Sequence, residues 1–127
     1  MKRKNIEPVA YSSTNYFLNG MRGHSAVQSI TSLGNDKYLI ARTNGRDPLT
    51  IMVADIYIAG EADLYELSDQ IQGVDALILI GFYNRYSSAA KTLAKNMGVG
   101  LFTNREFWGA VNLSGDKFMD YVSKGDD

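Results

Sequence analysis

The strongest structural signal in the chain is the stretch of residues 74–102, VDALILIGFYNRYSSAAKTLAKNMGVGLF. Its first part, residues 74–80, is an almost unbroken apolar run, which is typical of a strand covered on both faces of a sheet. Residues 86–97 have the apolar spacing of one helix face, and Gly98 suits the end of that helix. Residues 99–102 form a second short apolar run. Two strands joined by a helix predict a parallel pair with a right-handed crossover.

The first half of the chain predicts a helix followed by an antiparallel meander. Residues 11–21 have helical spacing, and Ser12 or Ser13 can cap their N-terminal end. Residues 27–58 are rich in strand-forming side chains, and the turn sequence Asn44-Gly45 divides them. We therefore expect two or three antiparallel strands in this segment.

Together these segments predict an α/β (α+β) domain. Residues 61–71 and 104–112 add one helix each, before and after the pair of parallel strands. The expected order is an N-terminal helix, an antiparallel meander and then α-β-α-β-α, with a mixed, centrally parallel sheet of about four to five strands. We expect one domain over residues 11–122, a flexible basic N-terminus over residues 1–10 and a flexible C-terminus over residues 123–127.

Composition excludes several classes of function. The chain has 127 residues, with 13 Lys and Arg against 14 Asp and Glu, so its net charge of -1 gives no global attraction to nucleic acid or membranes. It has no cysteine and one histidine, which excludes disulfides, thiolate sites and a multi-histidine metal centre within one chain. No apolar run is long enough to span a membrane, and no secretory signal follows the basic N-terminus. A cytoplasmic location with no membrane partner is the expectation.

Residues 74–102 resemble the C-terminal half of Mrr-like nuclease domains, which belong to the restriction-endonuclease-like superfamily. The resemblance rests on the strand VDALILIG, the helix segment AAKTLA and the final strand GVGLF. The predicted order of elements in the whole chain also matches the core of that superfamily. The resemblance implies a restriction-endonuclease-like core and a nuclease-like domain that acts on or binds nucleic acid, DNA or RNA.

The active site of this superfamily follows the pattern PD-(D/E)xK. Two carboxylates hold a divalent cation there, and a lysine positions or activates the attacking water. Carried onto this sequence, the resemblance implies Asp47 and Asp55 as ligands of Mg²⁺. Tyr57 stands at the position of the lysine, and either Lys91 on the following helix or Tyr57 itself would orient the attacking water. The order Asp47-Pro48 is also the reverse of the Pro-Asp in the pattern.

These departures leave three interpretations open. The first is an active magnesium-dependent phosphodiesterase, and the second is a relative with the same fold and without that chemistry. The third is an unrelated α/β fold. Asp55 bears on the choice because it interrupts an apolar strand, where a carboxylate costs free energy unless it is paired, binds a metal or faces water.

A second candidate site is the segment of residues 81–88, GFYNRYSS, between the apolar strand and the next helix. In open α/β sheets this position is the favoured ligand crevice. Arg85, Asn84 and Ser87 could hold a phosphate, and Tyr83, with Tyr86, could stack on a base or ring. The alternative is a capped turn in which Ser87 caps the helix and the tyrosines pack.

Two further expectations concern single residues and partners. His24 is expected in a turn, without a catalytic role, because no nucleophile elbow G-x-S-x-G is present. The aromatic content of 11% suggests a homodimer. The alternative function is a non-catalytic protein-binding or assembly module that uses residues 81–88.

Overall fold

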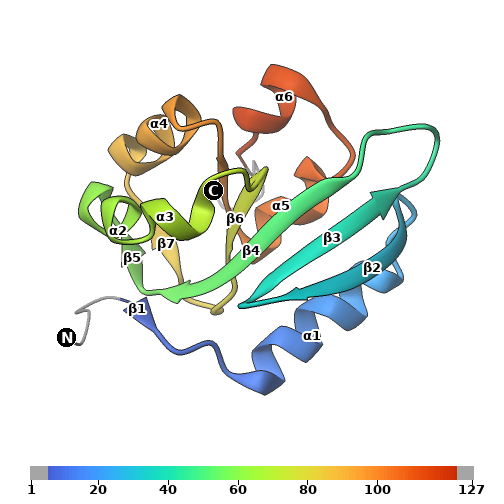
Figure 1. Cartoon of the computed structure of the whole chain (residues 1–127), viewed down its shortest axis with the longest axis horizontal. Coiled ribbons are helices and arrows are strands. Elements are labelled where there is room, and N and C mark those ends of the chain that lie inside the picture. The colour runs from blue at the N-terminus through green and yellow to red at the C-terminus, as the bar shows by residue number, and fades with distance from the viewer. Residues whose placement is uncertain (1–5, 123–127) are drawn as a thin grey trace.

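The computed structural model of the chain describes residues 6–122, which form a mixed sheet with helices on both faces (Figure 1). The strands are β1 (Ile6–Glu7), β2 (Val27–Gly34), β3 (Lys37–Arg42), β4 (Leu49–Ile56), β5 (Ile58–Ala59), β6 (Ala76–Leu79), β7 (Arg85–Tyr86) and β8 (Gly100–Thr103). The helices are α1 (Tyr11–Arg22), α2 (Glu61–Glu66), α3 (Ser68–Ile71), α4 (Ser88–Asn96), α5 (Asn104–Ala110) and α6 (Gly115–Met119).

The main sheet has the strand order β2-β3-β4-β6-β8, and the short β1 pairs with the end of β4. β2, β3 and β4 are antiparallel, whereas β4, β6 and β8 are parallel. The predicted antiparallel meander and the predicted parallel pair around a helix are therefore confirmed. β5 and β7 form a separate small parallel sheet that the sequence did not indicate.

Alternate residues of the central strands enter two separate cores. On β4, Ile51 and Val53 pack with α1, α5 and α6, whereas Met52 and Ala54 pack with α2, α3 and α4. β6 alternates in the same way. Both faces of the parallel strands are covered, as expected for an apolar run without a polar face.

The predicted boundaries differ from the structure where strands end. The sequence predicts one strand over residues 49–58, but the chain bends at Tyr57, so β4 ends at Ile56 and Ile58 begins β5 in the small second sheet. The Ile56 N–H is accepted by the side chain of Asn84 at 3.1 Å. The helix predicted over residues 61–71 is divided at Leu67 into α2 and α3. The helix predicted from residue 86 begins at Ser88, because residues 85 and 86 pair with β5.

The N-terminal boundary also differs. Ile6 and Glu7 pair with Ile56 and Asp55 of β4, so they belong to the sheet and not to a flexible segment. The rest of that predicted segment up to residue 5, and the predicted C-terminal tail over residues 123–127, lie outside the described residues. None of the helices in residues 6–122 has the length and the apolar composition to cross a bilayer.

We expect Leu79→Asp to unfold the domain. Leu79 is 0% exposed on β6 between β4 and β8, so an aspartate there would bury an unpaired charge at a cost of several kcal/mol, a large part of the ~5–15 kcal/mol that stabilises a typical domain. Circular dichroism with thermal melting measures the effect. Leu33→Asp is the matched control, because Leu33 is 51% exposed on the edge strand β2 and should tolerate the charge. A cooperatively melting Leu79→Asp protein would contradict the placement of β6.

Candidate functional site

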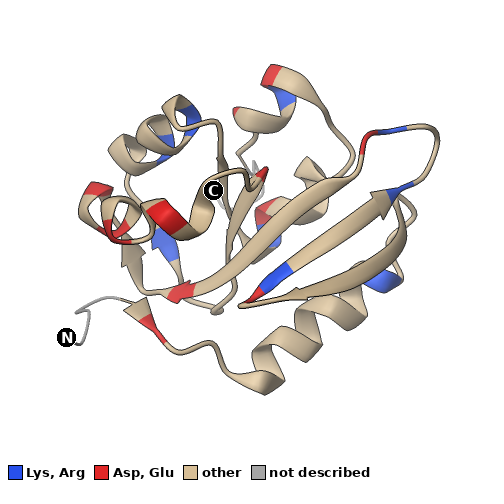
Figure 2. Cartoon of the chain, in the orientation of Figure 1, with Lys and Arg blue, Asp and Glu red and all other residues tan. Residues whose placement is uncertain are grey.

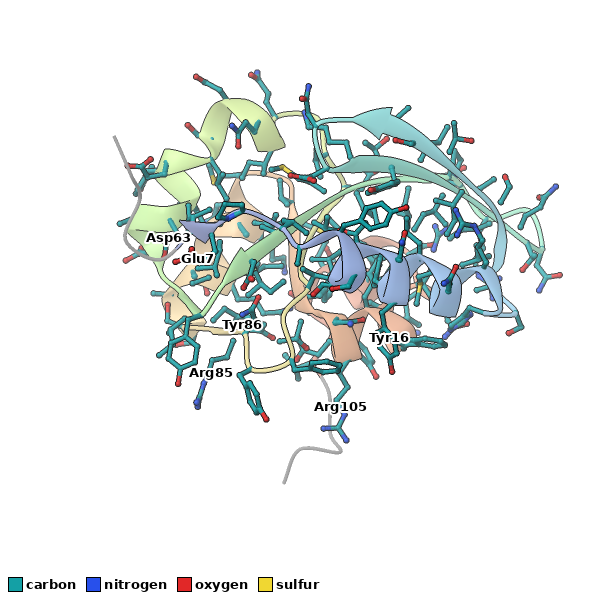
Figure 3. All side chains as sticks on the ribbon, turned by 90° about the horizontal axis from the view of Figure 1, so that it is seen from below. Glu7, Tyr16, Asp63, Arg85, Tyr86 and Arg105 are labelled. Atoms are coloured by element: carbon teal, nitrogen blue, oxygen red, sulfur yellow. The ribbon has the colours of Figure 1, made fainter. Side chains whose placement is uncertain are left out.

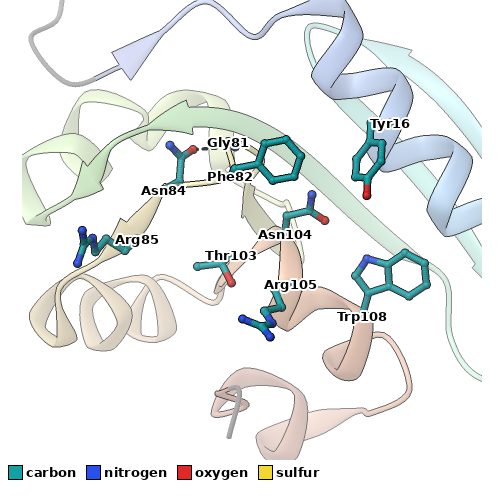
Figure 4. Close-up of a pocket in the computed structure, with 9 residues that line it drawn as sticks. All are labelled: Tyr16, Gly81, Phe82, Asn84, Arg85, Thr103, Asn104, Arg105 and Trp108. Carbon is teal, nitrogen blue, oxygen red and sulfur yellow. Dashed lines mark hydrogen bonds between the residues drawn. The ribbon is translucent and has the colours of Figure 1, made fainter. Parts of the chain in front are cut away.

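An open pocket lies at the carboxyl ends of the parallel strands β6 and β8, with a volume of about 730 Å³ (Figure 4). Its lining comes from α1, from the loop after β6, from the end of β8 and from α5. The lining residues are Tyr16, Gly81, Phe82, Asn84, Arg85, Thr103, Asn104, Arg105 and Trp108. We call this the carboxyl-edge pocket. Parallel strands end at the same edge of a sheet, so the segments that follow them meet there, as in other α/β proteins.

The side chain of Asn84 holds the strand ends together at this pocket. Its Oδ1 accepts hydrogen bonds from the backbone N–H of Ile56 at 3.1 Å and of Gly81 at 3.0 Å. Its Nδ2 donates to Oδ1 of Asp55 at 3.1 Å. One amide group therefore connects the end of β4, the end of β6 and a carboxylate. The sequence predicts Asn84 as a ligand-binding residue, whereas in the structure its side chain makes hydrogen bonds that stabilise the fold.

Two arginines give the pocket a local positive charge. Arg85 is exposed on β7, and Arg105 is exposed in the first turn of α5. Both extend from the same side of the molecule (Figure 3) and border the same pocket (Figure 4). In contrast, α2 and α3 carry acidic residues and neither Lys nor Arg (Figure 2). The charge of the domain is therefore unevenly distributed, although its sum is close to zero.

Tyr86 and Glu106 link β7 to α5, the two elements that carry Arg85 and Arg105. The Tyr86 hydroxyl contacts both carboxylate oxygens of Glu106, at 2.8 and 2.9 Å, and donates its proton to that carboxylate. Glu106 is 6% exposed and also accepts the N–H of Thr103, while the Thr103 hydroxyl oxygen accepts the N–H of Glu106. This reciprocal cap fixes the start of α5. Tyr86, expected to pack or to stack on a ring, is held by a buried carboxylate.

The structure does not bring the predicted metal ligands together. Asp47 precedes β4 and Asp55 lies near its end, so eight residues of mostly extended chain, about 26 Å, separate them. Oxygen ligands of Mg²⁺ lie only about 2.1 Å from the ion. Within residues 6–122 no group of three His, Asp or Glu side chains is placed to hold a metal. Asp47 and Asp55 therefore do not fit a shared magnesium ion.

Lys91 and Tyr57, the candidates for the lysine role, also serve other contacts. The Lys91 Nζ donates to the Leu101 carbonyl at 2.6 Å and lies 4.4 Å from the ring centre of Phe102. Burial lowers the pKa of Lys91 from 10.5 to about 8, and the nearby Glu106 carboxylate acts in the opposite direction. Tyr57 is 57% exposed between β4 and β5, and its carbonyl accepts the Arg85 N–H.

The remaining predicted residues have mixed outcomes. Ser87 is the N-cap of α4, and its hydroxyl oxygen accepts the Ala90 N–H at 3.1 Å, as in the alternative of a capped turn. Tyr83 is 81% exposed in the loop beside the pocket. His24 accepts the Ala26 N–H at Nδ1, so its Nε2 donates to the Trp108 carbonyl at 2.8 Å. This is a structural role, in agreement with the expectation of a turn residue.

Several pocket residues were not predicted from the sequence as site residues. They are Tyr16, Phe82, Thr103, Asn104, Arg105 and Trp108. The available signal was positional, because residues 103–105 lie at and directly after the end of β8 as residues 81–85 follow β6, and both strand ends border one crevice. Asn104 has a further feature, since its Oδ1 is buried without a hydrogen-bond partner among the described residues. Such an atom is uncommon in folded proteins and marks a polar site that still has an unused acceptor.

Comparisons of the chain with models of protein families, with curated proteins and with solved structures find no match.

We expect Asn84→Ala to lower the free energy of unfolding by about 2–4 kcal/mol. The change leaves the N–H groups of Ile56 and Gly81 without an acceptor, and each unsatisfied buried donor costs about 1–3 kcal/mol. Asp55→Ala removes a single hydrogen bond from the same cluster and should cost about 0.5–1.5 kcal/mol. Urea denaturation measures both, with the exposed Asn96→Ala on α4 as control. Equal effects of Asn84→Ala and Asn96→Ala would contradict this account.

The buried position of Lys91 predicts a pH-dependent stability. Because the pKa of Lys91 is about 8 in the folded chain and 10.5 for an ordinary lysine side chain, the unfolded chain binds the proton more tightly. The buried charge therefore costs stability below pH 8, and this cost is relieved as the pH rises from 8 to 10.5. Relative to Lys91→Met, the wild-type protein should become more stable across that window in urea denaturation. A constant difference between the two proteins would show that Lys91 is not desolvated.

Proposed function

We propose that the chain is a nucleic-acid-binding domain with a restriction-endonuclease-like core that binds phosphate groups at the carboxyl-edge pocket. It does so without the magnesium chemistry implied for Asp47 and Asp55. The observation that carries this proposal is the placement of Arg85 and Arg105, from two different strand ends, at one pocket.

The chemistry of the pocket supports a phosphate-bearing ligand. A guanidinium group is always charged at neutral pH and presents a planar set of donors that matches phosphate oxygens. Arg85 and Arg105 supply two such groups, and the Thr103 and Asn104 side chains add polar atoms at the same edge. The acidic helices α2 and α3 would repel a polyanion, so a nucleic acid would be confined to the pocket side.

The order of elements supports the proposed core. A helix precedes three antiparallel strands, and two further strands, each reached through helices, extend the sheet in parallel with β4. This is the order that the resemblance implies. The separation of Asp47 from Asp55 and the exposed Tyr57 at the lysine position support a binding role for this chain in place of cleavage.

A protein-binding module remains the second candidate function. It is favoured by one observation, the 83% and 81% exposed rings of Phe82 and Tyr83 at the tip of the loop. Apolar side chains displayed together on a surface often mark a contact with another protein. Binding of a nucleic acid should depend on Arg85 and Arg105 and weaken with added salt, whereas binding of a protein through Phe82 and Tyr83 should depend less on both.

We expect Arg85→Ala and Arg105→Ala each to weaken nucleic-acid binding by about 1–3 kcal/mol, which is the strength of a charge-assisted hydrogen bond. Each variant should also reduce the dependence of binding on salt, because one phosphate contact fewer releases fewer counterions. Fluorescence anisotropy with labelled oligonucleotides in EDTA measures both effects. Lys117→Ala is the control, since it removes the same charge from the exposed surface of α6.

Three results would count against the proposal. The first is equal binding by the arginine variants and by Lys117→Ala. The second is a loss of thermal stability in Arg85→Ala that is larger than its loss of binding. The third is magnesium-dependent cleavage of the oligonucleotide that Asp55→Ala abolishes, which would restore the catalytic interpretation.

A further inference from the structure

Three aromatic side chains that are far apart in the sequence meet at the carboxyl-edge pocket. Tyr16 comes from α1, Phe82 from the loop after β6 and Trp108 from α5 (Figure 4). They are 65%, 83% and 42% exposed. We call them the aromatic cluster. Large apolar rings at this exposure contribute little to the core, so their convergence on one pocket points to a ligand with an apolar, flat surface.

The three rings contact one another or neighbouring parts of the fold. The ring centres of Tyr16 and Phe82 lie 5.8 Å apart with an interplanar angle of 57°. The Trp108 ring lies directly against Gly20 of α1, where an added Cβ would come within 2.7 Å of it, and the ring of His24 lies 5.3 Å away. The Trp108 ring is therefore already in place for a ligand, which lowers the entropic cost of binding to it.

The loop that carries Phe82 is held at its base. Asn84 Oδ1 accepts the Gly81 N–H, and the Gly81 carbonyl accepts the Asn84 N–H at 3.1 Å. The exposed ring of Phe82 thus extends from a closed turn and not from a long free loop. Phe82 is 83% exposed and lines the same pocket as Tyr16, Arg85 and Arg105.

We propose that the nucleic acid bound at this pocket is single-stranded, with an unpaired base stacked on the aromatic cluster and its phosphates beside Arg85 and Arg105. This inference rests on the proposed function. In a duplex, the faces of the bases are covered by their neighbours and are not available to side chains, whereas unpaired bases stack readily on aromatic rings. Rings and arginines at one pocket therefore match a single strand better than a duplex.

The test compares four labelled oligonucleotides of roughly 15 nucleotides or base pairs: oligo-dT, oligo-U, a DNA duplex and an RNA duplex. Wild-type protein should bind the single strands at least about tenfold more tightly than the duplexes, and the comparison of oligo-dT with oligo-U shows whether the protein distinguishes DNA from RNA. Phe82→Ala should weaken single-strand binding by roughly 5- to 100-fold, the range measured for the loss of one stacked base. Phe82→Trp should retain binding.

Salt titration separates stacking from phosphate contacts. Between about 50 and 200 mM salt, Phe82→Ala should keep the wild-type slope because no phosphate contact is lost, whereas Arg85→Ala should reduce it. Tyr65→Ala is the matched control, since Tyr65 is 62% exposed on the acidic helix α2 and should have no effect. Trp108 is the single tryptophan of the chain, so quenching of its fluorescence by unlabelled oligo-dT reports contact at the cluster directly.

The outcomes separate this inference from the proposed function. Arginine-dependent binding with equal affinity for duplex and single strand, and with no effect of Phe82→Ala, overturns the single-strand inference and leaves phosphate binding in place. No binding to any of the four oligonucleotides overturns both. Binding in which Phe82→Ala and Tyr65→Ala have the same effect also overturns the inference, because the rings would then act without specificity.

Discussion

The rest of the structure depends on β4, the strand at which the sheet changes from antiparallel to parallel. It pairs with β3 on one side and with β6 on the other, and its side chains enter both cores in turn. A strand with two apolar faces must be covered on both sides. That requirement places α1, α5 and α6 on one face and α2, α3 and α4 on the other. It also brings the end of β4, with Asp55, to the edge where β6 and β8 end.

The parts of the fold that the sequence predicted are those with a regular hydrophobic period or a clear turn signal. The apolar run of β6 and the helix over residues 88–96 were located because each buries a repeated apolar face. The meander, whose strand β2 is mostly exposed, was located from its strand-forming residues and its Asn44-Gly45 turn. The short strands β1, β5 and β7 were missed, because a strand of two residues is too short to show a hydrophobic period. The end of β4 was misplaced because the apolar pattern continues across the bend at Tyr57, where the chain passes from the main sheet to β5.

The candidate site was predictable only in part, for a similar reason. The segment of residues 81–88 follows a recognisable strand, so its position in a crevice was expected, and Arg85 was identified there. Tyr16 and Trp108 were not, because their neighbourhood depends on how α1 and α5 dock on the same face of the sheet. The pair Asp47 and Asp55 came from a motif pattern, and the extended geometry of β4 keeps the two carboxylates apart.

The convergence of residues 16, 82 and 108 also bears on the order in which the molecule assembles. The meander can form from segments that are neighbours along the chain, but the carboxyl-edge pocket exists only after α5 has docked beside α1. Contacts between distant segments carry the largest loop-closure entropy. A ligand at this pocket would join the first helix to the fifth. Its binding energy would therefore be linked to the folding equilibrium of the whole domain and would add to the stability of the native state.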